Sequence, residues 1–319
     1  MNYLQGARLM KKSPFSLNFR CEPGKIELLE ENIQRIIAPN ASQMTFTGTN
    51  TYLVGNKCLA VIDPGPKNLT HLNSILSSVK PHQKITHILI THSHIDHSPL
   101  SKLLKEKTGA KIYAFGNSFS GKSSIMQRLS DQGDLRGGEG LDLEFKPDIL
   151  ITDNDIISNN EWSFEVIHTP GHLGNHVCFG LNEQNILFSA DHVMGWATSL
   201  VSPPDGDLTQ FMESLRKLLT KDQYTKFYPG HGDIISNPTE IINYIIDHRK
   251  MRETQIMNEL KDLSLTATKL TKAIYTEIDK SLIPAAARNV FAHLIDLGER
   301  DLVTKPKNLN FFSEFKKKL

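Results

Sequence analysis

The most constraining feature of the sequence is a dense polar motif that directly follows an apolar run. Residues 85–90 (ITHILI) have the length and composition of a buried strand, and THSHIDH follows at positions 91–97. Packing alone would bury these imidazoles together without partners, which costs free energy. The motif therefore predicts a metal centre where this strand ends. Its candidate ligands are His92, His94, Asp96 and His97.

Three further candidate ligands stand at other predicted strand ends. Each follows a short apolar run, and the two histidines among them lie in Pro-Gly-His turns. They are His172, Asp191 and His231. Seven ligands from four strand ends are enough for two metals with open coordination positions. Imidazole and carboxylate donors without thiolate favour Zn²⁺, and Mn²⁺ or Fe²⁺ would accept the same donors.

Up to about residue 240 the sequence alternates short β-branched runs with Gly, Pro and Asn, which indicates strands separated by turns and helices. The predicted strands are 50–54, 59–62, 85–91, 111–114, 164–168, 177–181 and 185–189. One helix is expected over 69–79, and another is expected to open with Ser98 as N-cap and Pro99 as its first residue. Residues 116–140 have little periodicity and are expected to form a long surface loop.

After residue 240 the sequence becomes mostly helical. A long helix from about 241 is followed by predicted helices at 267–278 and 284–297, an arrangement that suits a small winged-helix-like appendage. We therefore predict a catalytic domain over 1–240 and an appendage over 241–319. The net charge of +1 hides a difference between these parts. Residues 248–319 hold 14 Lys or Arg against 9 Asp or Glu, a net charge of +5, whereas residues 1–247 carry −4.

The number of cysteines and the length of the apolar runs indicate the cellular compartment of the protein. The chain has only three cysteines, Cys21, Cys58 and Cys178, in no paired spacing, which favours a reducing compartment. No apolar stretch approaches the roughly 20 residues that span a bilayer. We expect a cytoplasmic protein with no membrane span, with an organellar targeting role for residues 1–14 as the alternative.

At these motifs the sequence resembles the metallo-β-lactamase-fold superfamily, and the resemblance covers residues 45–240 and includes the turn Asp63-Pro64-Gly65. It implies an α/β fold, a four-layer αββα sandwich of two similar halves with the metals at one edge of the sheets. It assigns His92, His94 and His172 to one metal, Asp96, His97 and His231 to the other, and Asp191 to both. A glutamate at the position of His94 is typical of the diiron flavoprotein branch, so this histidine favours the zinc hydrolases.

Features after residue 200 narrow the resemblance to one group within the superfamily. Three features look like the β-lactamase-like protein 2 group, which has a winged-helix-like C-terminal domain: His248-Arg249 with Arg252 on the long helix, residues 285–294 (AAARNVFAHL) and residues 203–208 (PPDGDL). The animal members of that group are associated with cleavage of single-stranded RNA. The resemblance thus implies a hydrolase, with the substrate left between two classes.

The implied reaction is hydrolysis by a hydroxide that bridges two metals, with Asp96 as the catalytic residue that orients it. A small ester, thioester or lactone is favoured by the acidic body, and single-stranded RNA is favoured by the basic tail. Less favoured alternatives are an iron-dependent persulfide dioxygenase and a non-enzymatic nucleic-acid-binding module. A second copy of the chain is a further candidate partner, because the appendage could serve for dimerisation. Candidates for contacting substrate or orienting a ligand are His176, Trp196 and Ser199.

Overall fold

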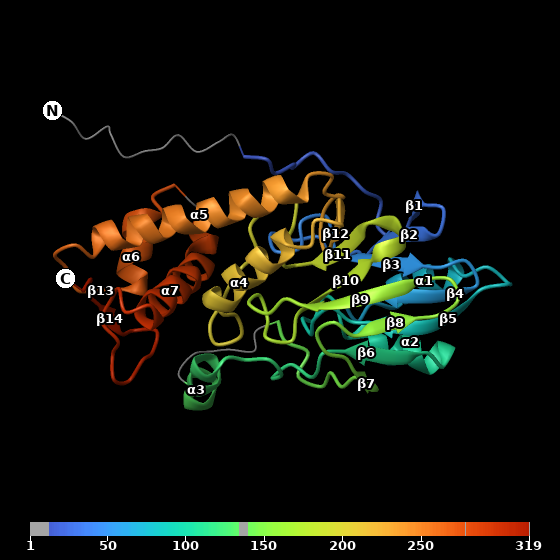
Figure 1. The fold of residues 1–319 in the computed structure, drawn as a ribbon, viewed down its shortest axis with the longest axis horizontal. Coiled ribbons are helices and arrows are strands. Elements are labelled where there is room, and N and C mark those ends of the chain that lie inside the picture. The colour runs from blue at the N-terminus through green and yellow to red at the C-terminus, as the bar shows by residue number, and fades with distance from the viewer. Residues whose placement is uncertain (1–12, 134–139, 278, 319) are drawn as a thin grey trace.

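The computed structural model describes residues 13–133, 140–277 and 279–318. Two β-sheets pack face to face, and helices cover both outer faces (Figure 1). The predicted four-layer αββα sandwich is therefore confirmed. Most of the segment 1–14, the alternative targeting segment, lies outside the described residues.

The first sheet has seven strands in sequence order, antiparallel from β1 to β4 and parallel from β4 to β7. Its strands are β1 (Ile26–Glu30), β2 (Ile33–Ile37), β3 (Asn50–Val54), β4 (Cys58–Ile62), β5 (Lys84–Leu89), β6 (Lys111–Ala114) and β7 (Ile149–Leu150). The second sheet has the order β12-β11-β10-β9-β8, and only β11 and β12 are parallel. Its strands are β8 (Ile156–Ser158), β9 (Ser163–His168), β10 (Val177–Leu181), β11 (Ile186–Ala190) and β12 (Lys226–Pro229).

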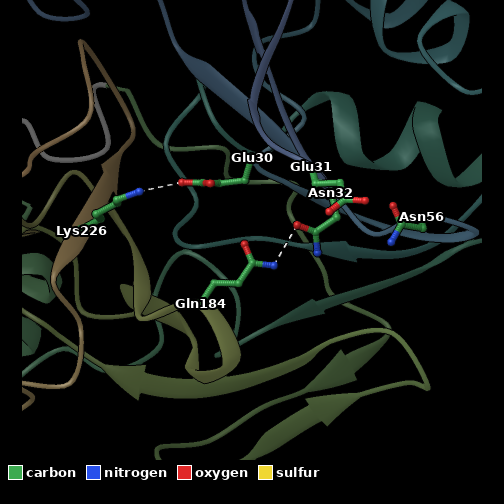
Figure 2. A pocket seen from close by; sticks show the side chains of 6 residues that line it. All are labelled: Glu30, Glu31, Asn32, Asn56, Gln184 and Lys226. Carbon is green, nitrogen blue, oxygen red and sulfur yellow. Dashed lines mark hydrogen bonds and ion pairs between the residues drawn. The ribbon is translucent and has the colours of Figure 1, made fainter.

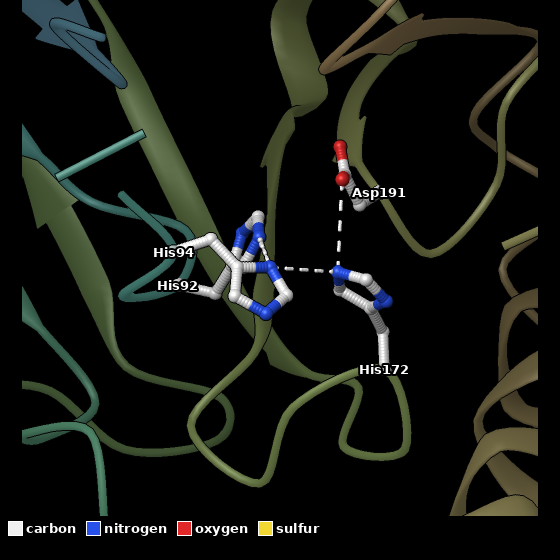
Figure 3. Close-up of side chains that lie close together, drawn as sticks. All are labelled: His92, His94, His172 and Asp191. Carbon is white, nitrogen blue, oxygen red and sulfur yellow. Dashed lines mark hydrogen bonds and ion pairs between the residues drawn. The ribbon is translucent and has the colours of Figure 1, made fainter. Parts of the chain in front are cut away.

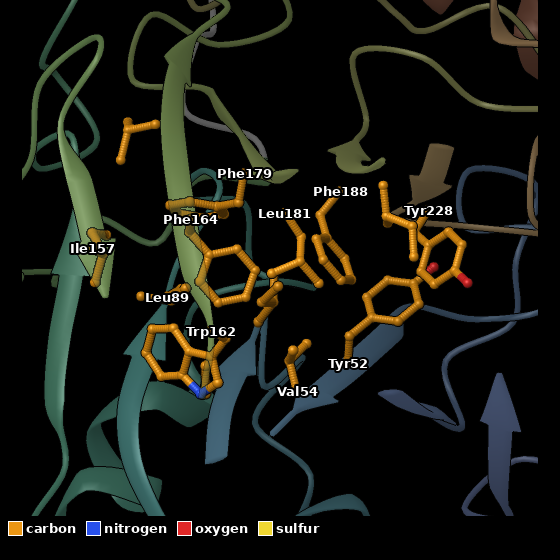
Figure 4. Close-up of a cluster of buried hydrophobic side chains, with 14 of the residues drawn as sticks. Tyr52, Val54, Leu89, Ile157, Trp162, Phe164, Phe179, Leu181, Phe188 and Tyr228 are labelled. Carbon is orange, nitrogen blue, oxygen red and sulfur yellow. The ribbon is translucent and has the colours of Figure 1, made fainter. Parts of the chain in front are cut away.

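The alternation of side chains along each strand divides the core into layers. On β4, Ala60 and Ile62 point between the sheets, whereas Leu59 and Val61 point to the helices outside. Aromatic side chains of the second sheet, such as Phe164 and Phe179, fill the space between the sheets (Figure 4). Because both faces of these strands are buried, they appear in the sequence as the short, nearly continuous apolar runs noted above.

Helices cover each sheet on its outer face. α1 (Leu69–Ser77) and α2 (Leu100–Thr108) pack on the first sheet, and α4 (Leu208–Leu219) and α5 (Pro238–Glu259) pack on the second. The 22 residues of α5 span about 33 Å at 1.5 Å per residue, so the helix extends well past the sheet (Figure 1). Its first half packs in the cluster over the second sheet, and Ile256 and Leu260 pack in a separate C-terminal cluster.

The C-terminal part is the predicted winged-helix-like unit. It consists of α6 (Ala267–Ile274), a 3₁₀ turn at Lys280–Leu282, α7 (Ile283–Glu299) and a small sheet of β13 (Leu265–Thr266) and β14 (Glu314–Phe315). Phe291, Leu294 and Leu297 of α7 lie at its apolar centre. The boundary at residue 240 stays a prediction, and it falls inside α5, which contacts both parts.

Three local predictions differ from the structure. Ser98 does not cap α2, because its hydroxyl donates to Asp142 Oδ2 at 2.9 Å, and the helix begins at Leu100 with Pro99 in the cap position. Residues 116–140 are not simply a loop, since they contain α3 (Ser124–Gln132), and residues 134–139 lie outside the described parts. α3 is stabilised by packing of Met126 and Leu129 in the C-terminal cluster, a long-range contact that local periodicity does not reveal.

The third difference is the unpredicted hairpin β1–β2. Arg35 in the middle of β2 is 1% exposed yet charged, because its Nη2 lies 2.7 Å from Glu27 Oε2 of β1. A buried cation interrupts the apolar pattern by which a strand is recognised. Within the described residues, no helix combines the length and apolar character that a membrane span requires.

Candidate metal centre

All seven candidate ligands follow the carboxyl ends of strands. The motif at 91–97 follows β5, His172 follows β9, Asp191 directly follows β11, and His231 follows β12. β11 and β12 are parallel, so their ends lie at the same edge of the sheet, and the Asn50 amide of β3 donates to Gly230 O, which joins that edge to the other sheet. The structure thus brings the seven side chains of four chain segments together.

The first group is formed by His92, His94, His172 and Asp191 (Figure 3). His94 Nδ1 lies 3.0 Å from His92 Nε2 and 3.0 Å from His172 Nε2. Nitrogens on a tetrahedral zinc ion, each about 2.05 Å from it, are about 3.3 Å apart. One ring proton on His94 could serve only one of the two neighbours, whereas a single cation would serve all three nitrogens.

The second group is formed by Asp96, His97 and His231. Asp96 Oδ2 lies 3.4 Å from His97 Nε2 and 3.2 Å from His231 Nε2. The donor atoms of each group lie within 4.8 Å of one another. This spacing is compact enough for one ion per group after small side-chain adjustments.

Asp191 lies between the two groups. Its Oδ1 is 3.4 Å from His97 Nε2, and its Oδ2 is 3.6 Å from His172 Nε2 and 3.4 Å from His231 Nε2. One carboxylate therefore faces histidines of both groups, which is the arrangement that a bridging ligand needs.

Four of the histidines are held by a hydrogen bond on the nitrogen that faces away from the centre. His97 Nδ1 contacts Asp63 Oδ2 at 2.9 Å, and His172 Nδ1 contacts Leu200 O at 2.8 Å. His231 Nδ1 lies 3.2 Å from Gly48 O, and His92 Nδ1 lies 2.9 Å from Thr91 Oγ1. With a proton on Nδ1, each ring keeps the Nε2 lone pair for a cation, as is usual for metal-binding histidines.

Asp63 has a larger role than the sequence indicated, since its Asp-Pro-Gly segment was interpreted only as a turn. Its Oδ1 accepts from the Thr91 amide at 2.8 Å and its Oδ2 from the Thr91 hydroxyl at 2.6 Å. Asp63 also has a φ of 48°, an uncommon conformation for a residue other than glycine. Asp63 contacts Nδ1 of His97, the ring nitrogen that faces away from Asp191. It therefore orients the His97 ring but does not lie where it could bind a cation held by His97 Nε2.

Charge in the centre is strongly coupled. Burial alone would lower the pKa of His97, but the nearby carboxylates, that of Asp96 first, raise it well above its usual value. Burial would also lower the pKa of His231, but Asp191 and Asp96 raise this pKa to about 10. For Asp96 and Asp191, burial favours the neutral acid, yet the adjacent histidines hold both pKa values well below the usual range. Two ionised carboxylates thus face histidines whose protons a divalent cation would replace.

The residues present fit divalent cations. Within the described parts of the chain, the buried atoms His97 Nε2 and Asp191 Oδ1 have no hydrogen-bond partner, and both are aimed at the space between the two groups. Gly230 leaves that space open, because a Cβ on it would lie 2.3 Å from Asp191 Oδ1 and 2.8 Å from His97 Cε1. The donor set of five imidazoles and two carboxylates is the chemistry that zinc and similar ions prefer.

The remaining candidate residues lie close to the centre in different settings. His176 is fully buried, with its ring centroid 5.1 Å from that of His92 and its Nδ1 2.8 Å from Thr169 Oγ1. Trp196 stacks on Phe46 at 5.0 Å between ring centroids. Ser199 is 1% exposed and donates its hydroxyl to the backbone oxygen of Asp191, so it lies behind that carboxylate. Thr49, which the sequence did not single out, has its Oγ1 3.2 Å from Asp96 Oδ2.

A separate hollow of about 480 Å³ lies at the other end of the strands (Figure 2). Glu30, Asn32, Asn56, Gln184 and Lys226 are among its lining residues. Lys226 begins β12, the strand whose opposite end leads to His231. The hollow is therefore distinct from the candidate metal centre.

Comparison with known families agrees with the fold. Residues 44–231, more than half of the chain, match the metallo-beta-lactamase superfamily, and residues 266–308 match the beta-lactamase associated winged helix domain. The chain belongs to the metallo-beta-lactamase superfamily, with that winged helix domain at its C-terminus. The resemblance deduced from the sequence is thereby confirmed.

Among individual relatives, the chain is similar to the beta-lactamase-like protein 2 homolog of Drosophila melanogaster. The two are 34% identical over 283 residues, which cover 84% of this chain and 88% of the relative. It is also similar to an atrochrysone carboxyl ACP thioesterase of Aspergillus fumigatus, at 28% identity over 75% of this chain and 68% of the relative.

Solved structures share the architecture. A beta-lactamase domain protein from Burkholderia ambifaria superposes with a TM-score of 0.77 at 17% identity, covering 93% of this chain and 95% of that one. A metallo-beta-lactamase family protein from Thermus thermophilus gives 0.72 at 19% identity, covering 91% of this chain and all of that one. At these identities the likeness concerns the fold alone.

Proposed function

We propose that the chain is a hydrolase that binds two zinc ions and acts on a small ester- or thioester-type substrate. The observation that carries the proposal is the pair of donor groups that share Asp191. When bound, two such cations supply Lewis acidity and lower the pKa of a water molecule toward neutrality. His92, His94 and His172 would hold one ion, Asp96, His97 and His231 the other, and Asp191 both.

Asp96 is the catalytic residue in this proposal. It is the most accessible of the three carboxylates at the centre, with 20% of its side chain exposed, and its low pKa keeps it ionised at neutral pH. Its carboxylate would accept a hydrogen bond from the attacking water and orient it. Thr49 Oγ1, 3.2 Å from Asp96 Oδ2, would hold the carboxylate in place.

The segments that border the ligands favour an apolar acyl substrate. Met44, Ile95, Phe119 and Leu143 are 51% to 59% exposed although they are large and apolar. Ile95 lies inside the ligand motif, and its amide donates to Gly140 O, next to the segment of Leu143. Phe119 lies near Asn117, whose carbonyl accepts from Asn175, and Asn175 also donates to Ser93 Oγ. Exposed apolar groups around a polar centre are typical of a ligand-binding surface. The similarity to a thioesterase supports the same substrate class.

Cleavage of single-stranded RNA is the second candidate, favoured by the net charge of +5 on residues 248–319. We place this candidate second because residues 1–247, which hold all seven candidate ligands, carry a net charge of −4. In the tail, ion pairs with carboxylates of the same part are formed by Lys269, Arg300, Lys305 and Lys318. We also propose a cytoplasmic location, in keeping with three free cysteines, and a homodimer stays a prediction.

One screen tests the proposed function. Purified protein is assayed with a panel of acyl thioesters and esters and with a labelled single-stranded RNA, at 50 and 200 mM salt, with and without chelator. We expect chelator-sensitive thioester or ester hydrolysis whose kcat/KM changes little with salt. RNA cleavage that falls steeply with salt, through counterion release, would favour the second candidate. Activity that depends on a single iron, or no hydrolysis of any substrate, would contradict the proposal.

A further inference from the structure

We propose that Arg249 on α5 is a positioning residue for the metal centre, because it fixes the two residues that hold His172 and Asp191. The inference rests on the proposed metal binding and deepens it. It also gives the middle of α5 a role at the candidate metal centre.

Arg249 is a buried cation with few partners. It is 2% exposed, its Nη2 donates to Ser199 O at 2.5 Å, and its Nη1 donates to Asn289 Oδ1 of α7 at 2.8 Å. Among the described residues no carboxylate lies within ion-pair distance of it, and its Nε has no hydrogen-bond partner. Burial, together with the neighbouring Arg252, lowers the pKa of Arg249 to about 10. Its guanidinium carbon also lies 5.4 Å from the centroid of the Phe211 ring. Burying a charge without a carboxylate partner is costly, so stability alone gives little reason for this side chain.

The segment that Arg249 holds contacts two candidate ligands. The carbonyl of Leu200 accepts from His172 Nδ1 at 2.8 Å, which directs His172 Nε2 to the centre. The hydroxyl of Ser199 donates to the backbone oxygen of Asp191 and lies 3.3 Å from that of His192. The guanidinium of Arg249 on the Ser199 carbonyl therefore fixes a peptide segment. This segment orients His172 of the first group and Asp191, which faces both groups.

Loss of Arg249 would free this segment to shift. His172 would then lose the partner that fixes its tautomer and its ring direction, and Asp191 would lose support for its backbone. Partners of this kind typically account for 10- to 100-fold in metal affinity. We therefore expect the ion held by His92, His94 and His172 to be affected more strongly than the ion held by Asp96, His97 and His231.

Zinc affinity of matched variants tests the inference. Arg249→Met removes the guanidinium while keeping much of its apolar volume, and Arg249→Lys keeps the charge but not the two-pronged contact. Arg252→Met is the control, because Arg252 lies on the same helix, donates to Gln255 and covers the ring of Tyr275 at 4.1 Å. Each protein is freed of metal, titrated with zinc against a chromophoric chelator, and its bound zinc is counted by mass spectrometry.

We expect Arg249→Met to bind one of its two zinc ions at least tenfold more weakly, Arg249→Lys to be intermediate, and Arg252→Met to match the unaltered protein. Two zinc ions bound by folded Arg249→Met with unaltered affinity would overturn the inference. So would a variant that only lowers the melting temperature of the metal-free protein, because a purely structural role would do that and leave the zinc affinity unchanged.

Two milder variants keep the test decisive if Arg249→Met does not fold. Asn289→Ala removes one partner of the guanidinium, and Ser199→Ala removes the hydroxyl that contacts Asp191. We expect both to weaken zinc binding by a few-fold, and normal affinity in both would overturn the inference. If the unaltered protein itself binds no zinc through His172, the proposed function fails as well. If it binds two ions and every variant does too, only the role of Arg249 fails.

Discussion

The ligand edge of the sandwich and the C-terminal part are built in contrasting ways. At the ligand edge, short segments after β5, β9, β11 and β12 bring polar side chains within 4.8 Å of one another, and hydrogen bonds on their outer nitrogens fix them. The C-terminal part is held by an apolar cluster around Phe291, and its Asn289 accepts from Arg249 of α5, which in turn donates to Ser199 O behind the candidate ligands. The candidate ligands thus come from short local motifs, whereas residues that hold their backbone in place come from distant parts of the sequence.

The largest effect is expected at Asp96. Asp96→Ala should lower kcat/KM by about 1,000-fold, because it removes both the acceptor for the attacking water and a ligand. The circular dichroism spectrum should be unchanged, since the side chain is partly exposed and belongs to no apolar cluster. Asp222→Ala, in an exposed position before β12, is the control and should retain full activity. Near-normal activity of Asp96→Ala on every substrate that the protein turns over would contradict the mechanism.

Gly230 tests how closely the ligand edge is packed. Gly230→Ala would place a methyl group 2.3 Å from Asp191 Oδ1, so we expect loss of at least one zinc ion and about a 100-fold fall in activity. Gly109→Ala is the matched control, because a Cβ there meets nothing within 4 Å although φ is +75°. It should cost about 1 kcal/mol in unfolding free energy and leave activity intact. Equal zinc content in the two variants would refute the close packing inferred here.

Asp63 tests the orienting hydrogen bonds. Asp63→Asn keeps the size of the side chain but leaves one acceptor oxygen. Either His97 Nδ1 and the Thr91 hydroxyl, which share Oδ2, or the Thr91 backbone amide, which donates to Oδ1, then meets an amide donor. We expect zinc affinity to fall 10- to 100-fold in chelator competition. Asp148→Asn, which contacts Lys105 and the Ile112 amide away from the centre, should bind zinc normally. Unchanged affinity in Asp63→Asn would mean that the orientation of His97 has another source.

The smallest effect is expected in the exposed tail. The double variant Lys316→Ala and Lys317→Ala removes two exposed charges near the end of the chain. Thioester or ester turnover should stay within about twofold of the unaltered protein, because exposed charges contribute little at a distance in salt. A large loss of turnover would show that the tail contacts the substrate and would bring the RNA candidate forward.

The sequence predicts the ligand edge well because each ligand follows a strand that is apolar enough to recognise. The strands 50–54, 111–114 and 177–181 have the predicted bounds, and all seven candidate ligands meet. β9 and β11 are both antiparallel to β10 and β12 is parallel to β11, so the residues that follow β9, β11 and β12 lie at the same edge of the sheet.

What the sequence does not predict depends on contacts between distant segments. Asp63 was interpreted as a turn residue, because its link to His97 crosses 34 positions of the chain. α3 is not predicted, since Ile125, Met126 and Leu129 anchor it and their partners lie in the C-terminal part. Arg249 and Ser199 are 50 positions apart, and although Ser199 is a candidate residue from the sequence, nothing in the sequence indicates its contact with Arg249. Such pairs become visible only once the layers are assembled.

The central claim is that two cations share Asp191 at the ligand edge, and anomalous diffraction from zinc-loaded crystals tests it most directly. Data on both sides of the zinc absorption edge should give two peaks about 3.5 to 4 Å apart. One peak is expected among His92, His94 and His172 and the other among Asp96, His97 and His231, with the carboxylate of Asp191 between them. A single peak, or two peaks that leave Asp191 without a bond to either ion, would contradict the account.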